Sequence, residues 1–91
     1  MHTVLWKRQA FNDLARISEF IAQDSAANAE KLVELITSKA LSLASHPQIG
    51  RIGRKSGTKE LVVHEHYVVI YRVLSARVEI LRVKHTAQRW P

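Results

Sequence analysis

Cysteine is absent from this 91-residue chain, which excludes disulfide bonds, thiolate metal sites and cysteine nucleophiles and is compatible with a reducing compartment. No apolar run approaches the roughly 18 residues of a membrane span. The N-terminus also lacks the charged and then apolar pattern of a secretory signal. These absences predict a cytoplasmic protein with no membrane partner.

Acidic residues are few, since 8 Asp and Glu stand against 14 Lys and Arg, which gives a net charge of +6. The imbalance lies in the second half of the chain: Lys31 and Lys39 have Glu30 and Glu34 beside them, whereas nine cations after residue 50 have only three acids. Such a field attracts phosphates or an acidic protein. The alternative interpretation is a charged surface that only keeps the protein soluble.

A hydrophobic content of 46% is enough to build one core, and no internal segment has the composition of a linker. We therefore predict a single domain over residues 1–91. A domain of this size has a small free energy of unfolding, so a bound partner would stabilise it.

Hydrophobic periodicity predicts a short strand followed by two helices. Residues 3–6 are a β-type run, and residues 10–22 carry apolar side chains at steps of three and four, as in an amphipathic helix. Asp24 or Ser25 is suited to cap a second helix, which should stop at Pro47. The short gap between the two helices makes them antiparallel neighbours.

The second half predicts a loop and three strands. Residues 48–57 hold all three glycines and several cations, which indicates an exposed basic loop. Runs rich in Val, Ile, Leu and Tyr follow at 60–64, 67–74 and 78–84, with breaks too short for a crossover helix. The predicted fold class is therefore α+β, with an N-terminal strand, an antiparallel helical hairpin and a three-stranded antiparallel meander.

Strand alternation places certain side chains on a common side. It groups Val68, Ile70 and Arg72 on one strand, and Val78, Ile80, Arg82 and Lys84 on the next. If Arg72 and Arg82 were adjacent, they would form a site for a phosphate or carboxylate. Alternatively, one of them extends to solvent at an edge or pairs with an acid such as Glu60 or Glu65.

Three sequence blocks in the second half are specific enough to suggest a family. They are Pro47-x-x-Gly50-Arg51-x-Gly53-Arg54-x-x-Gly57-Thr58-Lys59-Glu60-Leu61-Val62-Val63, the run from His66 to Val73, and the run from Val78 to His85. Behind a helical hairpin, these blocks resemble the RelE/ParE superfamily of bacterial toxins from type II toxin-antitoxin systems.

The resemblance implies a growth-inhibiting toxin with no cofactor, which a separately encoded antitoxin keeps silent. That partner would be acidic and partly disordered and would fold as it binds. The apolar surface that it needs would lie on the helical hairpin or beside Trp90 and Pro91.

Members of the superfamily act on two targets. ParE-like members bind DNA gyrase and stall it on cleaved DNA, and residues 66–73 and 78–85 are more similar to theirs. RelE-like members enter the ribosome and cut mRNA, and they usually place an arginine where this chain has Val68. The resemblance therefore favours gyrase as the target, with the ribosome and its mRNA as the alternative.

For the nuclease alternative the resemblance implies a catalytic group without a metal ion. A base removes the 2′-hydroxyl proton, cations stabilise the phosphate and an acid protonates the leaving oxygen. The candidates are His85 as acid or base with Arg82, Arg72 and Lys59, and Tyr67 or Trp90 for stacking on a base.

For binding an anion or the target, the candidates are Arg51, Arg54, Arg72, Arg82, Arg89 and Trp90. The simpler interpretations are a solvated loop around Arg51 and Arg54 and a structural histidine at position 85.

We predict no metal site, because His64 and His66 have a suitable spacing but no third ligand. A third class of function, a plain nucleic-acid-binding module, would explain the charge. The sequence shows neither interleaved surface aromatics nor a recognition helix to support it.

Overall fold

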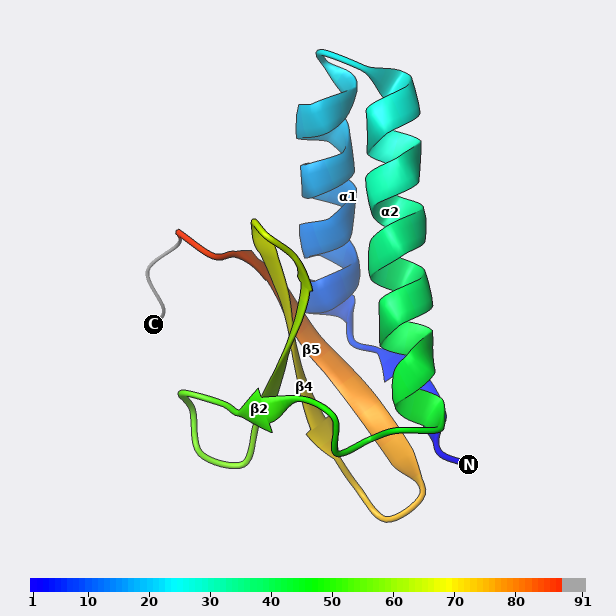
Figure 1. Cartoon of the computed structure of the whole chain (residues 1–91), viewed down its shortest axis with the longest axis vertical. Helices are drawn as coiled ribbons and strands as arrows, with labels where there is room; N and C mark the ends of the chain where they lie inside the picture. The colour runs from blue at the N-terminus through cyan, green and yellow to red at the C-terminus, as the bar shows by residue number, and fades with distance from the viewer. Residues whose placement is uncertain (88–91) are drawn as a thin grey trace.

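The computed structural model describes residues 1–87 and has the expected α+β architecture, with a helical hairpin against one side of a five-stranded sheet (Figure 1). Neither helix in this part of the chain is long and apolar enough to cross a bilayer. The elements are β1 (Thr3–Trp6), α1 (Arg8–Ala22), α2 (Ala26–Leu41), a 3-10 turn (Ser42–Ala44), β2 (Arg51–Ile52), β3 (Lys59–His64), β4 (Tyr67–Val73) and β5 (Arg77–His85).

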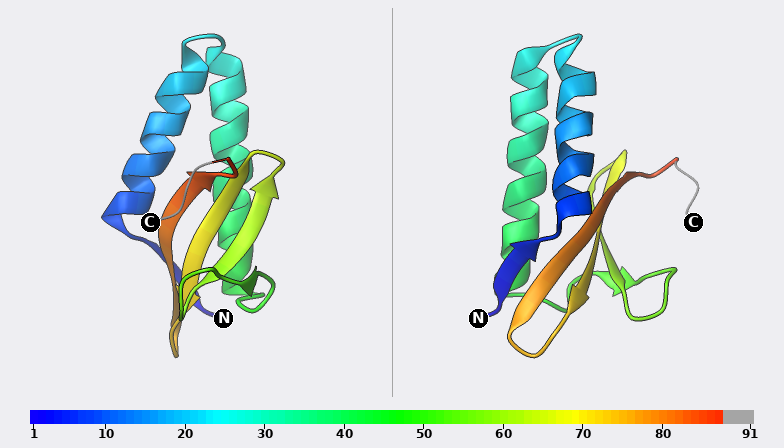
Figure 2. Two further views of the ribbon diagram at one scale, coloured as in Figure 1. Left: turned by 90° about the vertical axis from the view of Figure 1, so that its left-hand side faces the viewer. Right: turned by 180° about the vertical axis from the view of Figure 1, so that it is seen from behind.

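The sheet has the order β1-β5-β4-β3-β2. Strands β3, β4 and β5 form the predicted antiparallel meander, and β2 adds two residues within the segment expected to be a loop. The N-terminal strand lies parallel to β5. Parallel strands need a long connection, and the chain between β1 and β5 is long enough to cross from one end of the sheet to the other. Figure 2 shows the hairpin on one side of the sheet and no helix on the other. We call this uncovered side the open face.

The starts of both helices agree closely with the sequence pattern, whereas α2 ends at Leu41, before the predicted stop at Pro47, and is followed by the 3-10 turn. Helix α1 starts at Arg8, two residues before the predicted position, and α2 starts after Ser25, whose Oγ accepts a hydrogen bond from the Asn28 amide at 3.1 Å. Ser25 is therefore the N-cap, one of the two residues predicted for that role.

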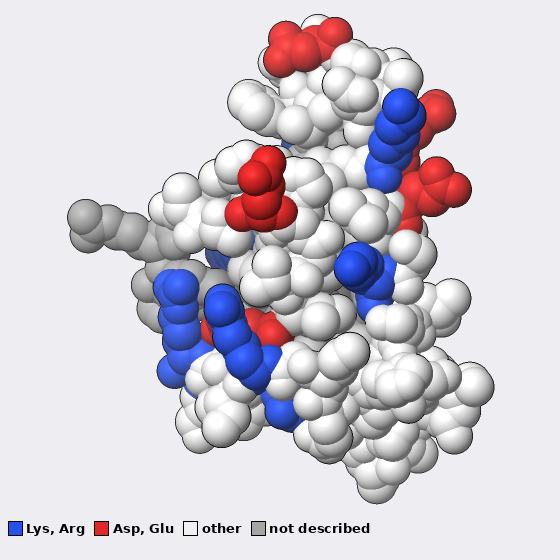
Figure 3. Space-filling view, viewed as in Figure 1, with Lys and Arg blue, Asp and Glu red and all other residues white. Residues whose placement is uncertain are grey.

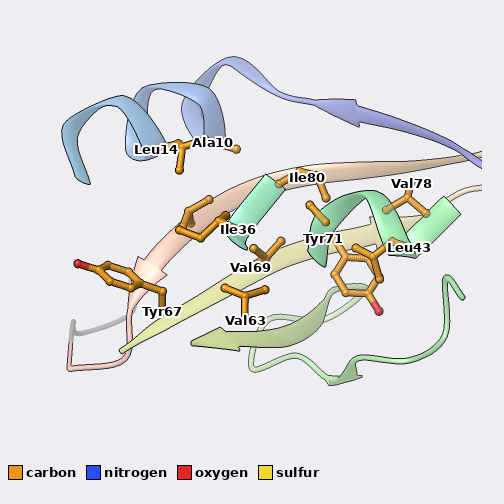
Figure 4. Packing of buried hydrophobic residues seen from close by; sticks show 12 residues of the cluster. Ala10, Leu14, Ile36, Leu43, Val63, Tyr67, Val69, Tyr71, Val78 and Ile80 are labelled. Atoms are coloured by element: carbon orange, nitrogen blue, oxygen red, sulfur yellow. The ribbon is translucent and has the colours of Figure 1, made fainter. Parts of the chain in front are cut away.

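The core lies between the hairpin and the helix-facing side of the sheet (Figure 4). Tyr71 is fully buried there, and its hydroxyl donates to the Pro47 carbonyl and accepts from the Gly50 amide, both at 2.9 Å. A Cβ at position 50 would lie 2.6 Å from that hydroxyl, so the segment needs glycine at this point. The core residues are Ala10, Leu14, Ile36, Ala40, Leu43, Val63, Tyr67, Val69, Tyr71, Val78, Ile80 and Val83.

The predicted alternation of β5 is wrong beyond Ile80, because the strand contains a β-bulge. Ile80 pairs with Tyr71 and Arg82 pairs with Ile70, which leaves Leu81 as an extra residue. One extra residue reverses the side to which all later side chains point. Val78 and Ile80 therefore face the helices, whereas Arg82 and Lys84 lie on the open face with Arg72.

Candidate anion-binding groove on the open face

A groove of about 780 Å³ runs along the open face of the sheet. Seven of its eleven lining residues are Lys or Arg and none is acidic. The groove therefore has a strong positive potential that attracts anions. We call it the cationic groove. Its lining consists of Lys7, Arg8, Gln9, Arg54, Lys55, Thr58, Ile70, Arg72, Leu81, Arg82 and Lys84.

Three separate segments build this groove. The junction of β1 and α1 forms one wall, the loop between β2 and β3 contributes Arg54, Lys55 and Thr58, and β4 and β5 provide the floor. The first turn of α1 contains no acidic residue and its N-cap, Lys7, forms no capping hydrogen bond through its side chain. The partial positive charge at the start of the helix therefore adds to the lysine and arginine charges.

Arg82 in the groove floor is held by a buried carboxylate from α1. Its Nε lies 2.8 Å from Asp13 Oδ2 and its Nη2 lies 3.1 Å from Asp13 Oδ1, and the Val83 amide also donates to Asp13 Oδ2 at 3.0 Å. The pairing of β1 with β5 ends at Ile80, so Asp13 accepts the hydrogen bond of a β5 amide beyond the end of β1.

These contacts keep Asp13 ionised. Burial alone would raise its pKa, but the hydrogen bonds from Arg82 and Val83 and the charge of Arg82 outweigh that effect, and the pKa lies below its usual value. The same hydrogen bond raises the pKa of Arg82. Arg82 is therefore fixed in orientation and permanently charged.

Arg72 is fixed in a similar way by Glu79, its cross-strand neighbour. Its Nε donates to Glu79 Oε1 at 2.6 Å, and Arg77 Nε donates to the other carboxylate oxygen at 3.0 Å. The hydrogen bond from Arg72 is the main reason that the pKa of Glu79 is lowered, with a further contribution from Arg77. Arg72 and Arg82 can share one groove because each has its own carboxylate, Glu79 and Asp13 rather than the Glu60 or Glu65 proposed from sequence.

The glycine-containing basic segment, residues 48–57, is organised around Glu60. Arg51 donates to Glu60 Oε1 from Nη2 at 3.1 Å, and the Arg54 backbone amide donates to Oε2 at 2.9 Å. Arg54 lines the cationic groove, whereas Arg51 does not. Lys59 follows on the helix-facing side, opposite Tyr71, and its Nζ donates to the Gly50 carbonyl at 3.2 Å.

His85 lies at the far end of the meander, across from Tyr67. Its ring stacks on His66 with 5.5 Å between the ring centroids and meets Tyr67 edge-on at 5.3 Å. Its Nδ1 accepts a hydrogen bond from the Ala87 amide at 3.0 Å, as expected for a histidine at a strand end. Phe20 joins it in lining a smaller hollow of about 370 Å³ between α1 and β5.

Within residues 1–87, no group of three or more metal-ligating side chains is close enough to hold an ion. His66 follows the end of β3, and its amide donates to His64 Nδ1 at 3.1 Å, so that nitrogen already has a partner.

The structure does not bring the four candidate nuclease residues to a common point. Lys59 lies on the helix-facing side and Arg72 on the open face. His85 on β5 lies opposite Tyr67 of β4, and Tyr67 is five residues before Arg72 on that strand. Five residues of a strand span about 17 Å. Arg82 lies between Arg72 and His85 and is bound to Asp13. Arg89 and Trp90, also predicted from sequence, lie outside the described residues.

Sequence reasoning did not identify Lys7, Arg8, Lys55 and Lys84 as site residues. Lys55 lies in the segment that was predicted to be a basic loop, but no local pattern indicates that the start of α1 lies next to it. On the face drawn in Figure 3, one group of Lys and Arg side chains lies near β2, and others lie along α2 close to acidic side chains.

Residues 4–90 match the family model described as the ParE toxin of the type II toxin-antitoxin system, parDE. The chain belongs to the ParE toxin family. This toxin is 35% identical over 88 residues to Toxin RelE2 of Caulobacter vibrioides, in a match that covers 97% of this chain and 99% of that protein. The family model is named for ParE, whereas this relative is named RelE2. The names therefore do not decide between the two targets considered from the sequence.

Two solved structures have the same fold. The chromosomal ParDE toxin-antitoxin system from P. aeruginosa matches with a TM-score of 0.81 at 24% identity, over 93% of this chain and 96% of that one. The RelBE2 complex from Mycobacterium tuberculosis matches with a TM-score of 0.71 at 23% identity, over 92% and 96%. The protein is thus a RelE/ParE-superfamily toxin of a type II toxin-antitoxin system.

Proposed function

We propose that this toxin inhibits DNA gyrase and does not cut ribosome-bound mRNA. The observation that supports this choice is the separation of His85, Arg72 and Lys59 over two faces and two ends of the sheet. A metal-independent nuclease needs its base, acid and cations within about 3 Å of one phosphodiester group. An inhibitor that acts by binding needs only a surface that complements its target.

The charge and its arrangement agree with such a binding surface. The cationic groove is lined by seven cations, and two of its arginines are already oriented by Asp13 and Glu79. Neither of these arginines has to lose side-chain entropy when a partner arrives, because ion pairing has already restricted them.

We propose further that the antitoxin is acidic and covers apolar side chains of the hairpin. Phe11 and Phe20 on α1 are 63% and 67% exposed, and Leu41 at the end of α2 is 65% exposed. Aromatic and aliphatic groups this exposed are suited to the apolar face of an amphipathic segment.

Two assays on the purified toxin test the choice of target. In a supercoiling assay with purified gyrase, the proposal expects loss of supercoiling and accumulation of cleaved plasmid DNA trapped by gyrase. In a reconstituted translation reaction it expects no new mRNA 5′ ends. Ribosome-dependent mRNA cleavage with unaffected gyrase would overturn the proposal and support the nuclease alternative.

A His85→Ala variant separates the two mechanisms within one protein. A nuclease that uses His85 as acid or base would lose about 10²-fold to 10⁴-fold in cleavage rate. Under the gyrase proposal the variant inhibits supercoiling at nearly the same concentration as the unmodified toxin, provided that its circular dichroism spectrum shows an intact fold.

A further inference from the structure

We propose that the cationic groove binds the sugar-phosphate backbone of duplex DNA, so that the toxin contacts the DNA held by gyrase as well as the enzyme. The inference depends on the proposed function for its biological purpose. Binding of DNA by the groove is a separate property, which can be measured without gyrase.

The first argument is that four groove cations are not neutralised internally. Within residues 1–87, Lys7, Arg8, Lys55 and Lys84 form no ion pair with an acidic side chain. They come from α1, its N-cap, the β2–β3 loop and β5, and they line one groove. Lysine and arginine charges in this situation release counterions from a nucleic acid when they bind its phosphates.

The second argument concerns the arginines of the groove floor. A guanidinium group has five N–H donors, and the carboxylates of Asp13 and Glu79 engage Nε and one Nη of Arg82 and Arg72. The remaining donors of these two arginines are held in fixed positions. Preoriented donors suit a phosphate oxygen, which accepts hydrogen bonds from several directions.

The third argument distinguishes a nucleic-acid backbone from other anions. None of the eleven lining residues is aromatic, so the described groove offers no surface on which bases could stack. Gln9 adds an uncharged hydrogen-bonding group of the kind that contacts phosphates. Cations on both walls and on the floor match the dense charge of duplex DNA, about one charge per 1.7 Å of axis, better than the separated carboxylates of an acidic peptide.

The test measures binding of fluorescently labelled 20-base-pair duplexes to the purified toxin by anisotropy, without gyrase. Two unrelated sequences should bind equally well, because backbone contacts carry no sequence information. With about four phosphate contacts, affinity should fall about 10²-fold between 50 and 200 mM potassium chloride. Affinity that is insensitive to salt would contradict the proposal.

Two matched variants locate the binding surface. The groove variant combines Lys55→Glu with Lys84→Glu, and the control combines Lys31→Glu with Lys39→Glu on α2, outside the groove. Both variants change the net charge by the same amount, and circular dichroism and urea unfolding verify that both fold. The groove variant should lose at least about tenfold in affinity and about two units of salt slope, and the control much less.

Equal losses in both variants would mean that net charge alone attracts DNA, which would overturn the proposal. So would tighter binding of single-stranded RNA than of duplex DNA, or better competition by polyglutamate than by DNA at equal charge. If the groove variant loses DNA binding and still inhibits gyrase fully, the DNA contact has no part in inhibition and gyrase remains the target. If the unmodified toxin binds DNA through the groove but leaves gyrase unaffected, the proposed function fails and the groove assignment stands.

Discussion

The two sides of the sheet differ in how they are stabilised. On the helix-facing side, Val69, Tyr71 and Ile80 are completely buried, and removal of apolar surface from water provides the driving force. On the open face the carboxylate of Glu79 is almost completely buried although no helix covers it, and Arg72 and Arg77 bind both of its oxygens. A sheet with a helical layer on one side therefore uses charged side chains to complete the other.

Charge on the open face serves two purposes, and the division follows residue type except at Arg8, which lines the groove without an acidic partner among residues 1–87. Arginines bind the buried carboxylates, because the guanidinium fork matches a carboxylate with two hydrogen bonds. Lys7, Lys55 and Lys84 line the groove with no acidic partner among the described residues, and they contribute a field that reaches into solvent. This comparison separates residues that hold the fold from residues that attract a ligand, and substitutions can test the separation.

The largest effect is expected for Asp13→Ala. The substitution leaves Arg82 without its carboxylate and the Val83 amide without its acceptor, so the free energy of unfolding should fall by about 3 kcal/mol. Urea unfolding at pH 7 measures this, with Asp24→Ala in the exposed turn between the helices as a control expected to change it by less than about 0.5 kcal/mol. Similar losses in both variants would show that Asp13 is not a special anchor.

The contribution of Asp13 should depend on pH in a defined direction. Its pKa is lower in the folded protein than in the unfolded chain, so its stabilisation is complete above the unfolded value of about 3.9 and is lost as the pH falls through the folded value. The difference in urea midpoint between the unmodified toxin and Asp13→Ala should therefore shrink below about pH 4. A constant difference from pH 7 to pH 2 would contradict this account.

On the helix-facing side, Tyr71→Phe tests the single buried hydroxyl that ties residues 47–50 to the sheet. Loss of its bonds to the Pro47 carbonyl and the Gly50 amide should lower the free energy of unfolding by about 2 kcal/mol. Tyr67→Phe is the matched control, because the Tyr67 hydroxyl makes no hydrogen bond with another described residue. Thermal unfolding of both variants should show the larger drop for Tyr71→Phe, and equal drops would argue against the role assigned to the hydroxyl.

A smaller effect is expected at Gly57, in the loop that carries Lys55. Gly57 has φ of +79° and open space around its Cα, so Gly57→Ala introduces backbone strain without a clash. We expect a loss of about 1 kcal/mol by urea unfolding. An unchanged midpoint would mean that this loop adjusts its backbone freely.

The smallest effect on stability is expected for Lys55→Gln combined with Lys84→Gln. The two lysines have no ion pairs among residues 1–87 to lose, so the free energy of unfolding should change by less than about 0.5 kcal/mol while DNA affinity falls. Calorimetry and anisotropy on one preparation measure both properties. A large loss of stability would remove the distinction between arginines that hold the fold and lysines that line the groove.

Local sequence patterns were sufficient for the secondary structure and much of the topology. Apolar spacing predicted both helices, Ser25 was identified as a possible cap, and the β-rich runs predicted the meander of β3, β4 and β5. These features depend on interactions between residues that are close in the sequence, or on short connections, and periodicity reports them directly.

The groove was decided by tertiary structure. The bulge at Leu81 places Arg82 on the open face, and only the packing of β4 against β5 determines that one residue is left unpaired there. Asp13 and Arg82 are 69 residues apart, and the parallel return of β5 to β1 brings α1 close enough for them to pair. Composition fixed the amount of positive charge, but the arrangement of strands and the buried carboxylates determined which cations are paired and which line the groove.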